Sequence, residues 1–500
     1  AINLAGANAK LTLMGDGKII IEDEMDFTFT GTGYFNYYDD GIIWLGDNSK
    51  FILQGTGSTD RKMKLNTNAL LHITSHDVEI NDCKIEYASG SSFKNSWNYV
   101  TFDYVNCVDL SAGSAAHAIE GDDINDLLVN QSTFDGFSSA IKIDDVTTCP
   151  GEINININYS TFTNHTFVAI EANNVERMRL NTSTLIGKDA TVQAGLFLED
   201  IEFCELHNST VKQYTMNNTD AAGIFAKNVD ELSLDGAVVR NCHDGIESRN
   251  TNIFVRSGGV IKLNTNGINF LSALEVGGTP SELNRLVVGD IGCGWIIQND
   301  YGVIGEDVFL DIDQQIHANA SENAFLIYPN RFDGNTVKVF QICYTHYTGA
   351  SIVTPIAASH CYWTGGTAPA ASTYKIGFSA DPQCDDISLI TPSYYPTQPT
   401  TCDCIGEECN TNPTDENIQA RLGSTSCNYT IPKQGGGTIT IANQYRDAYM
   451  YFANHQYNYA YAKFNWLNNK VNAQYGSSGL PNGICRQLHQ SSARLLPICD

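Results

Sequence analysis

Two acidic pairs are the residues of this sequence whose type and spacing best suit chemistry. Asp122 and Asp123 are followed 22 residues later by Asp144 and Asp145. Carboxylates about 5 Å apart can act as acid and nucleophile in glycoside hydrolysis, and carboxylate oxygens are also ligands for calcium. Asp122 and Asp144 are therefore candidate catalytic residues and candidate calcium ligands, and Glu199 is a third catalytic candidate. The alternative is a solvated acidic surface, which is the commoner arrangement in so acidic a chain.

Two histidines are further acid–base candidates. His117 and His243 each lie just before a copy of a recurring phrase, where a loop would present their imidazoles. A single histidine at the corner of a repeat is more often structural, because catalysis also requires an orienting group and a cleft.

These residues belong to a short phrase that recurs between residues 118 and 299. The phrase consists of a small residue, an apolar residue, any residue, a mostly small or apolar residue, a mostly polar residue, and then Asp, Asn or Ser. Its eight copies begin at Ala118, Ala140, Ala169, Gly195, Gly223, Gly245, Gly267 and Gly294. Successive copies start 22 to 29 residues apart, and such a period marks a repeat architecture.

Apolar and polar residues alternate within the phrase, as in Ala140-Ile141-Lys142-Ile143-Asp144. This alternation is typical of a strand with one buried face, and a second alternating piece follows in each unit. Two or three short strands in about 22 residues leave no room for a crossover helix. The sequence therefore predicts an all-β fold, a parallel β-solenoid in which each coil pairs with the next at roughly 4.8 Å. Asp122 and Asp144 would then be outward neighbours.

The last position of the phrase predicts a column of turn residues. Asn and Asp tolerate left-handed backbone, and their stacked side chains can bond to neighbouring backbone. The column contains Asp123, Asp145, Asn174, Asp200, Asn228, Asn250, Ser272 and Asn299. It resembles the asparagine ladder of right-handed parallel β-helix proteins over roughly residues 40–345, and the resemblance implies that fold.

Gly121-Asp122-Asp123 also resembles the Gly-Asp-Asp element of polygalacturonases, another β-helix family. The rest of that family's pattern is missing, since the sequence has no Gly-His-Gly and no Arg-Ile-Lys, and Asn264-Thr265-Asn266 lies on the wrong side of Gly121. Elimination of the pectate-lyase type would need an arginine base near calcium carboxylates. Arg240 and Arg249 are the nearest arginines, more than 90 residues beyond Asp144. The resemblance implies a hydrolase or lyase without a full catalytic set.

Several asparagines head glycosylation sequons. Four of them, Asn130, Asn158, Asn181 and Asn208, are expected at the same place in successive units. A position that recurs with the repeat is better explained by stacking of short polar side chains at a turn than by attached sugar. Asn319 and Asn428 lie outside that register and are the candidate glycosylation sites.

The chain is strongly acidic, with 29 Lys and Arg against 56 Asp and Glu and a formal net charge of -27. This charge opposes binding to nucleic acid and to anionic membranes. It also disfavours polyanionic glycans unless a divalent cation bridges the like charges. No run approaches 18 apolar residues, so we expect no direct membrane insertion. Calcium is the one cofactor that the sequence suggests.

The 15 cysteines fall into two groups. Six are scattered through the repeats and fit small buried apolar positions: Cys83, Cys107, Cys149, Cys204, Cys242 and Cys293. Nine gather toward the carboxyl end and are disulfide candidates: Cys343, Cys361, Cys384, Cys402, Cys404, Cys409, Cys427, Cys485 and Cys499. Such disulfides would indicate an oxidising, extracellular setting. Zinc is the competing interpretation, but paired Cys-x-x-Cys motifs are missing.

Four regions are expected along the chain. Residues 1–40 would cap the solenoid, with strands at Lys10–Leu13 and Lys18–Ile21, and residues 41–345 would form the solenoid itself. An insertion at residues 89–98 would form the lip of a groove. Residues 346–414 are a loop or linker region rich in Cys, Pro and Thr, and residues 415–500 a helical, Tyr-rich module.

Within that module, residues 416–422 and 442–471 are predicted to be helical. The longer helix has aromatic residues on more than one face, which exceeds what docking on a single surface requires. It is either a tail helix buried among its neighbours or an intermolecular contact surface. The interface candidates are Tyr445, Tyr449, Phe452, Tyr459 and Trp466.

Two functions of different classes fit these features. The first is a non-catalytic structural or adhesive protein, extracellular or at the cell surface, that associates with itself, other surface components or polysaccharide in a filament, sheath or layer. The general arrangement resembles large surface proteins of Bacteroidota, which implies this function. The second is a carbohydrate-active hydrolase or lyase with its site on the outward acidic face. A third, a phage-type tailspike, would need a trimerising end that the sequence does not reveal.

Overall fold

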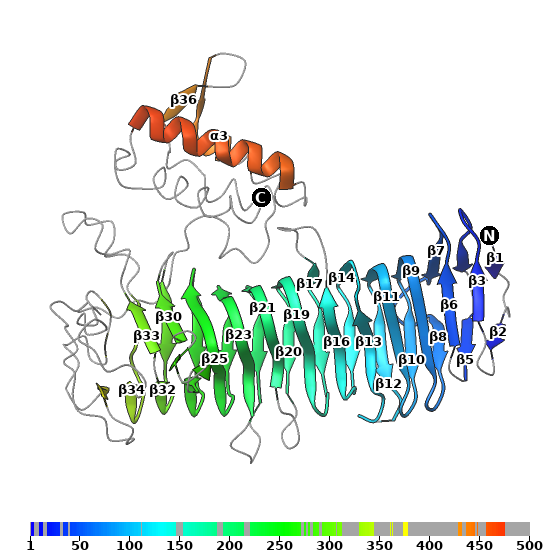
Figure 1. Cartoon of the computed structure of the whole chain (residues 1–500), viewed down its shortest axis with the longest axis horizontal. Coiled ribbons are helices and arrows are strands. Elements are labelled where there is room, and N and C mark those ends of the chain that lie inside the picture. The colour runs from blue at the N-terminus through cyan, green and yellow to red at the C-terminus, as the bar shows by residue number, and fades with distance from the viewer. Residues whose placement is uncertain are drawn as a thin grey trace.

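The computed structural model describes most of the repeat region and short stretches nearer the carboxyl end (Figure 1). The described residues are 2–4, 10–13, 18–30, 34–38, 41–111, 113–146, 154–187, 194–214, 221–271, 275–276, 279–280, 284–289, 293–306, 308–312, 330–344, 361, 363, 374–378, 429–432, 437–445, 448 and 457–475.

Each regular coil consists of three short strands joined by tight turns. In one coil, β19 (Val168–Asn181) bends at Asn174 and so supplies two of the three, and β20 (Thr184–Ile186) is the third. We call the resulting surfaces face 1 (168–173 and the segments in register with it), face 2 (175–181 and its register partners) and face 3 (the sheet that contains β20). Coils pair in parallel with the next coil, as Figure 1 shows, so the predicted all-β parallel solenoid is confirmed.

Faces 1 and 2 belong to one continuous 21-stranded sheet. Its strands are β1 (Ile2–Leu4), β3 (Lys18–Ile21), β4 (Phe27–Phe29), β6 (Gly41–Leu45), β7 (Lys50–Gln54), β9 (Leu70–Asn81), β11 (Ser92–Asp103), β13 (His117–Asp122), β14 (Asp126–Asn130), β16 (Ser139–Val146), β17 (Ile155–Asn158), β19, β21 (Ala194–His207), β23 (Ala222–Asp235), β25 (Asp244–Arg256), β27 (Asn266–Phe270), β30 (Asn284–Val288), β32 (Tyr301–Glu306), β33 (Val308–Ile312), β34 (Lys338–Tyr344) and β35 (Tyr374–Phe378).

Face 3 is a separate 12-stranded sheet. Its strands are β2 (Lys10–Leu13), β5 (Tyr34–Tyr37), β8 (Arg61–Leu65), β10 (Lys84–Tyr87), β12 (Asn106–Asp109), β15 (Thr133–Asp135), β18 (Thr161–Thr163), β20, β22 (Thr210–Lys212), β24 (Val238–Arg240), β26 (Gly259–Lys262) and β31 (Gly294–Ile297). Two antiparallel pairs stand apart: β28 (Glu275–Val276) with β29 (Thr279–Pro280), and β36 (Thr430–Pro432) with β37 (Thr438–Thr440).

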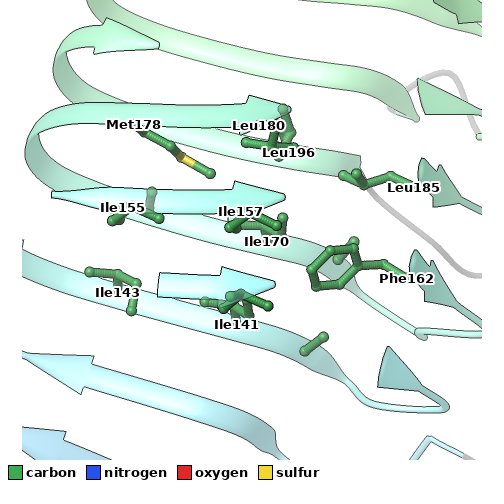
Figure 2. Packing of buried hydrophobic residues seen from close by; sticks show 14 of the residues in the cluster. Ile141, Ile143, Ile155, Ile157, Phe162, Ile170, Met178, Leu180, Leu185 and Leu196 are labelled. Carbon is green, nitrogen blue, oxygen red and sulfur yellow. The ribbon is translucent and has the colours of Figure 1, made fainter. Parts of the chain in front are cut away.

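Inward side chains of successive coils stack into columns that fill the solenoid. On face 1 the second residue of each phrase is fully buried, as at Ile141, Ile170 and Leu196, and Figure 2 shows these side chains turned into the same interior. On face 3, Phe134 and Phe162 stack with ring centroids 4.8 Å apart. Each coil covers the apolar side chains of the next coil. This burial contributes roughly 25 cal/mol of stability per Å² of apolar surface removed from water.

The small residue that opens each phrase is explained by close backbone contact between coils. A Cβ atom on Gly223 would lie 2.7 Å from the backbone oxygen of Gly245, and one on Gly245 would lie 2.4 Å from the backbone oxygen of Gly267. Earlier coils have Ala140 and Ala169 at this position. Only the smallest side chains therefore fit at this point of the coil.

Two expectations about boundaries differ from the structure. Strands β2 and β3 have the predicted bounds and pair in parallel with β5 and β6, and the capping role of residues 1–40 stays a prediction. The predicted insertion at 89–98 is wrong, because β11 pairs in register with β9 from Ser92 onward. At the other end β35 pairs with β34, so parallel pairing continues into the predicted linker.

The described residues near the carboxyl end form a helix packed on a hairpin. Helix α3 spans Tyr457–Tyr475 and residues 441–445 are also helical, which agrees with part of the predicted 442–471 helix; the predicted 416–422 helix lies outside the described residues. The indole nitrogen of Trp466 donates to the carbonyl oxygen of Pro432 at 3.2 Å. Within the described residues, no helix has the length and apolar character needed to span a membrane.

Candidate functional site

The register of face 1 brings the two candidate catalytic aspartates together. Strand β13 pairs with β16 so that Asp122 lies opposite Asp144, one inter-strand spacing of about 4.8 Å away. The same outward column continues through Asn173 to Glu199, one residue per coil. The prediction that Asp122 and Asp144 are neighbours on the outer surface is confirmed.

Side chains of adjacent coils bind all three catalytic candidates. The Nζ atom of Lys94 lies 2.9 Å from Asp122 Oδ2. The Nδ2 atom of Asn173 donates to Asp144 Oδ1 at 2.7 Å. Glu199 forms an ion pair with Lys227 of the following coil. The outward carboxylates of face 1 thus connect one coil to the next.

A cation of the chain already lies beside the proposed calcium ligands. Lys94 is 3.9 Å from Glu120 in addition to its contact with Asp122, and the hydrogen bond to Asp122 is the largest cause of its raised pKa. Among the residues that the structure describes, no three or more His, Cys, Asp and Glu side chains are grouped so that they could hold a metal ion. Calcium binding at Asp122 and Asp144 stays a prediction.

The histidines make contacts that join coils or neighbouring residues. The Nδ1 atom of His117 lies 3.2 Å from the carbonyl oxygen of Ser139 in the next coil, and burial lowers the pKa of His117. The Nδ1 atom of His243 lies 3.1 Å from Asp244 Oδ1. These contacts fit the structural interpretation of both histidines.

Neither arginine weighed for elimination chemistry stands beside the aspartate pair. Arg240 lies on β24 in face 3. Arg249 lies in the outward column of face 1, opposite Lys227, and therefore several strands beyond Asp144. The structure does not assemble an arginine with the two carboxylates.

The turn between faces 1 and 2 contains the predicted ladder. Six predicted members have left-handed backbone with φ between 50° and 55°: Asp123, Asp145, Asn174, Asp200, Asn228 and Asn250. Side-chain amides link the column, since Asn228 donates to Asp200 at 2.8 Å, Asn250 donates to Asn228 at 3.3 Å, and Asn174 donates to Asp145. Ser272 lies outside the described residues.

Asn299 belongs to a different ladder, so its assignment to this column is wrong. The phrase that starts at Gly294 forms β31, which pairs with β26 in face 3. Asn299 is buried, its Oδ1 accepts the backbone N–H of Asn264 at 3.0 Å, and its own N–H donates to Asn335 Oδ1 at 3.0 Å. The residue pattern that starts at Gly294 therefore lies on face 3, whereas the earlier copies of the phrase lie on face 1.

The sequon asparagines are in register with one exception. Asn130, Asn158 and Asn181 follow one another at the end of face 2 as predicted. Asn208 is displaced by one residue, because His207 is the register partner of Asn181. The candidate glycosylation sites Asn319 and Asn428 lie outside the described residues.

A buried serine column accompanies these asparagines, in line with the expected stacking of short polar side chains at this turn. Ser132, Ser160, Ser183 and Ser209 are all buried. The backbone N–H of each donates to the Oγ of the next, at 3.1 Å from Ser132 to Ser160 and from Ser160 to Ser183, and at 3.0 Å from Ser183 to Ser209. The hydrogen bonds of this column explain why a serine recurs two residues after Asn130, Asn158 and Asn181.

Four of the described cysteines within the coils are buried thiols, as predicted. They are Cys83, Cys107, Cys204 and Cys242, and burial raises the pKa of Cys83 and of Cys242 to about 12. Cys293 is buried but disulfide-bonded, so the prediction of a simple buried apolar residue is wrong there, and Cys149 lies outside the described residues.

The disulfide candidates are tested at few positions. Cys361 is a buried thiol, so the disulfide expectation fails there. Cys343 lies on β34. The remaining candidates lie outside the described residues: Cys384, Cys402, Cys404, Cys409, Cys427, Cys485 and Cys499.

Two of the candidate interface residues have described contacts, both within the helix–hairpin unit. Tyr445 is buried, with its ring centroid 5.7 Å from that of Phe464. Trp466 binds Pro432, and Lys470 Nζ lies 4.4 Å from the centroid of its ring. Tyr459 lies on α3, and Tyr449 and Phe452 lie outside the described residues. For Tyr445 and Trp466 these contacts favour the packing interpretation.

Exposed aromatic side chains on and beside β11 form a surface that the sequence analysis did not identify. Trp97, Tyr99 and Tyr104 are 58%, 55% and 44% exposed. Trp97 and Tyr104 have φ of 58° and 54° and lie at the two turns that bound face 2. One signal in the sequence could have revealed this surface. Trp97 occupies the turn position at which the next coil has Asp123.

Comparisons with known proteins add little. No protein-family model matches the chain, and no curated protein matches it. One solved structure, the A-module of the mannuronan C-5 epimerase AlgE6 from Azotobacter vinelandii, aligns at 10% sequence identity over 77% of this chain and 91% of that chain. Its TM-score is 0.23, too low to carry any argument about the activity of this chain.

Proposed function

We propose that the protein is a non-catalytic, rigid element outside the cell that adheres to polysaccharide or other surface components, or assembles with copies of itself. The observation that carries the proposal is the state of the outward carboxylates. Asp122, Asp144 and Glu199 bind Lys94, Asn173 and Lys227 of adjacent coils. The three carboxylates therefore connect neighbouring coils, and this structural role accounts for their position without a catalytic one.

The fold supports this proposal through its rigidity. A continuous apolar core and parallel pairing at every level hold each coil to the next, so the solenoid presents long flat faces at a constant spacing. The net charge of -27 keeps such a surface soluble and directs it toward uncharged partners or toward anions bridged by cations.

The experiment combines a measurement of the particle with a measurement of products. Sedimentation and negative-stain images report whether the protein is a monomer or a uniform polymer. The protein is then incubated with neutral and acidic polysaccharides, and the mixtures are assayed for reducing ends and unsaturated products. We expect neither kind of product. Product that disappears in Asp122→Asn or Asp144→Asn, but persists in the exposed control Glu202→Gln, would overturn the proposal.

A carbohydrate-active hydrolase or lyase is the second candidate, and one observation favours it. Asp122 and Asp144 lie opposite each other on adjacent strands, and a spacing near 5 Å is that of the carboxyl pair in retaining glycosidases. The product assay above separates the two candidates, because only the enzyme releases sugar in a manner that depends on these two residues.

A further inference from the structure

We propose that Trp97, Tyr99 and Tyr104 form a platform that binds an uncharged glycan chain. The inference rests on the adhesive function proposed above and specifies its ligand. The three side chains are more than two-fifths exposed and come from β11 and the turns at its two sides. Trp97 and Tyr104 lie at the two turns that bound face 2, and Tyr99 lies on the strand between these turns.

The backbone at two of these residues is unfavourable for the side chains that it holds. Left-handed φ is tolerated by Asn and Asp but is uncommon for bulky residues. The backbone N–H of Trp97 donates to the carbonyl of Asp123, the Asp that occupies this turn in the next coil. The turn that holds Tyr104 has Asp82 in the preceding coil and Gln131 in the following one, both with left-handed φ. Trp97 and Tyr104 stay 58% and 44% exposed, so neither ring is fully buried in return for its strained turn, and strained backbone clusters at functional sites.

The polar surroundings of the platform fit a sugar chain. Tyr99 lies between Asp77 and Asp126 on the adjacent strands. The Asp77 carboxylate is 3.2 Å from Lys50 Nζ, which holds it in place. Carboxylate oxygens accept hydrogen bonds from hydroxyl groups, while an aromatic face stacks on the apolar face of a sugar ring.

The same surroundings argue against other partners. The aromatic rings alternate with polar residues and carboxylates, whereas the core of a protein interface is depleted of charged residues. The flanking aspartates and the net charge of -27 oppose a polyanion. An uncharged glycan satisfies both constraints.

The test measures binding of the full chain to insoluble cellulose, β-1,3-glucan and mannan, with alginate and chitosan as charged alternatives. Trp97→Asn supplies a residue that the left-handed turn tolerates, and Tyr99→Thr removes the central ring. We expect each variant to reduce affinity for the preferred neutral glycan at least tenfold. Thermal unfolding of Trp97→Asn should occur at the same or a higher temperature, which a purely structural role of the indole would not produce.

Leu263→Asn is the matched control. Leu263 is also exposed and has a φ of 58°, but it lies at the turn that follows face 3. This variant should share the stability change and keep wild-type glycan binding. Wild-type binding to no neutral glycan, stronger binding to alginate or chitosan, or binding unaffected by Trp97→Asn and Tyr99→Thr would overturn the platform. In the last case adhesion would stand with another site, whereas failure of the adhesive function itself would appear as no binding of the wild type to any glycan of the panel, neutral or charged.

Discussion

Two polar columns run along the same solenoid, and they are polar for different reasons. The serine column, represented by Ser160, is buried at the turn between faces 2 and 3, where each hydroxyl accepts a backbone N–H. The ladder represented by Asn174 lies at the turn between faces 1 and 2, with left-handed backbone and an exposed link to Asp145. In this solenoid, a recurring polar residue therefore either accepts a hydrogen bond from a buried backbone N–H or occupies a turn with left-handed backbone.

The comparison predicts unequal costs. Removing a buried acceptor leaves a donor without water and costs the full desolvation of that group. Removing an exposed side chain leaves water as a substitute, so only the backbone preference of the new residue counts. The following predictions proceed from the largest expected effect to the smallest.

The largest effect concerns His165, an enclosed polar group whose Nε2 atom lies 3.0 Å from the hydroxyl of Tyr214. Burial lowers the pKa of His165 from 6.5 to about 4. The unfolded chain thus binds the proton first, so stability is complete above pH 6.5 and is lost as the pH falls toward 4. The loss attributable to this group is about 3 kcal/mol, measured as the free energy of unfolding in urea across that range.

His165→Phe separates this contribution from the titration of the many carboxylates. Whatever the starting stability of the variant, its free energy of unfolding should fall less steeply between pH 6.5 and 4 than that of the wild type. Parallel curves for the two proteins would show that the buried imidazole does not couple to folding.

Ser160→Ala tests the buried column itself. The backbone N–H of Ser132 loses its acceptor in the interior, so we expect a loss of about 2 kcal/mol in the free energy of unfolding. Thr161→Ala is the control, since Thr161 is adjacent in sequence but points outward on face 3. Equal losses in the two variants would remove the distinction between the columns.

Asn174→Ala tests the exposed ladder. The expected loss is about 1 kcal/mol, because alanine is strained in the left-handed conformation, and Asn174→Gly should recover much of it. Thermal unfolding of the two variants provides the comparison. If glycine proves as costly as alanine, the amide link to Asp145 matters more than the backbone conformation.

The smallest effect is expected on the outer surface of face 1. Lys142 Nζ lies 3.6 Å from Glu171 Oε1, and both side chains are partly exposed. Lys142→Met should lower the free energy of unfolding by less than about 1 kcal/mol, and 1 M salt should erase the difference. A larger loss that persists in salt would place this surface pair among the buried polar contacts.

Much of the architecture was predictable from the sequence because in a solenoid residues one period apart become neighbours in space. The alternation in residues 140–144 indicated a strand with one buried face, and the offset of 22 residues predicted that Asp122 would lie opposite Asp144. The ladder from Asp123 to Asn250 followed from the preference of Asn and Asp for left-handed turns.

Tertiary structure decided what periodicity leaves open, namely the face on which a phrase lies and which of its side chains are enclosed. Asn299 ends a copy of the phrase whose strand belongs to face 3. Asn208 lies one residue after the register partner of Asn181, although the strands on either side stay in register. The partner of Asp122 is Lys94, and the backbone N–H of Trp97 donates to the carbonyl oxygen of Asp123. Spacing along the chain sets which residues share a column, but only the packed coils determine whether that column meets water, the core or a neighbouring charge.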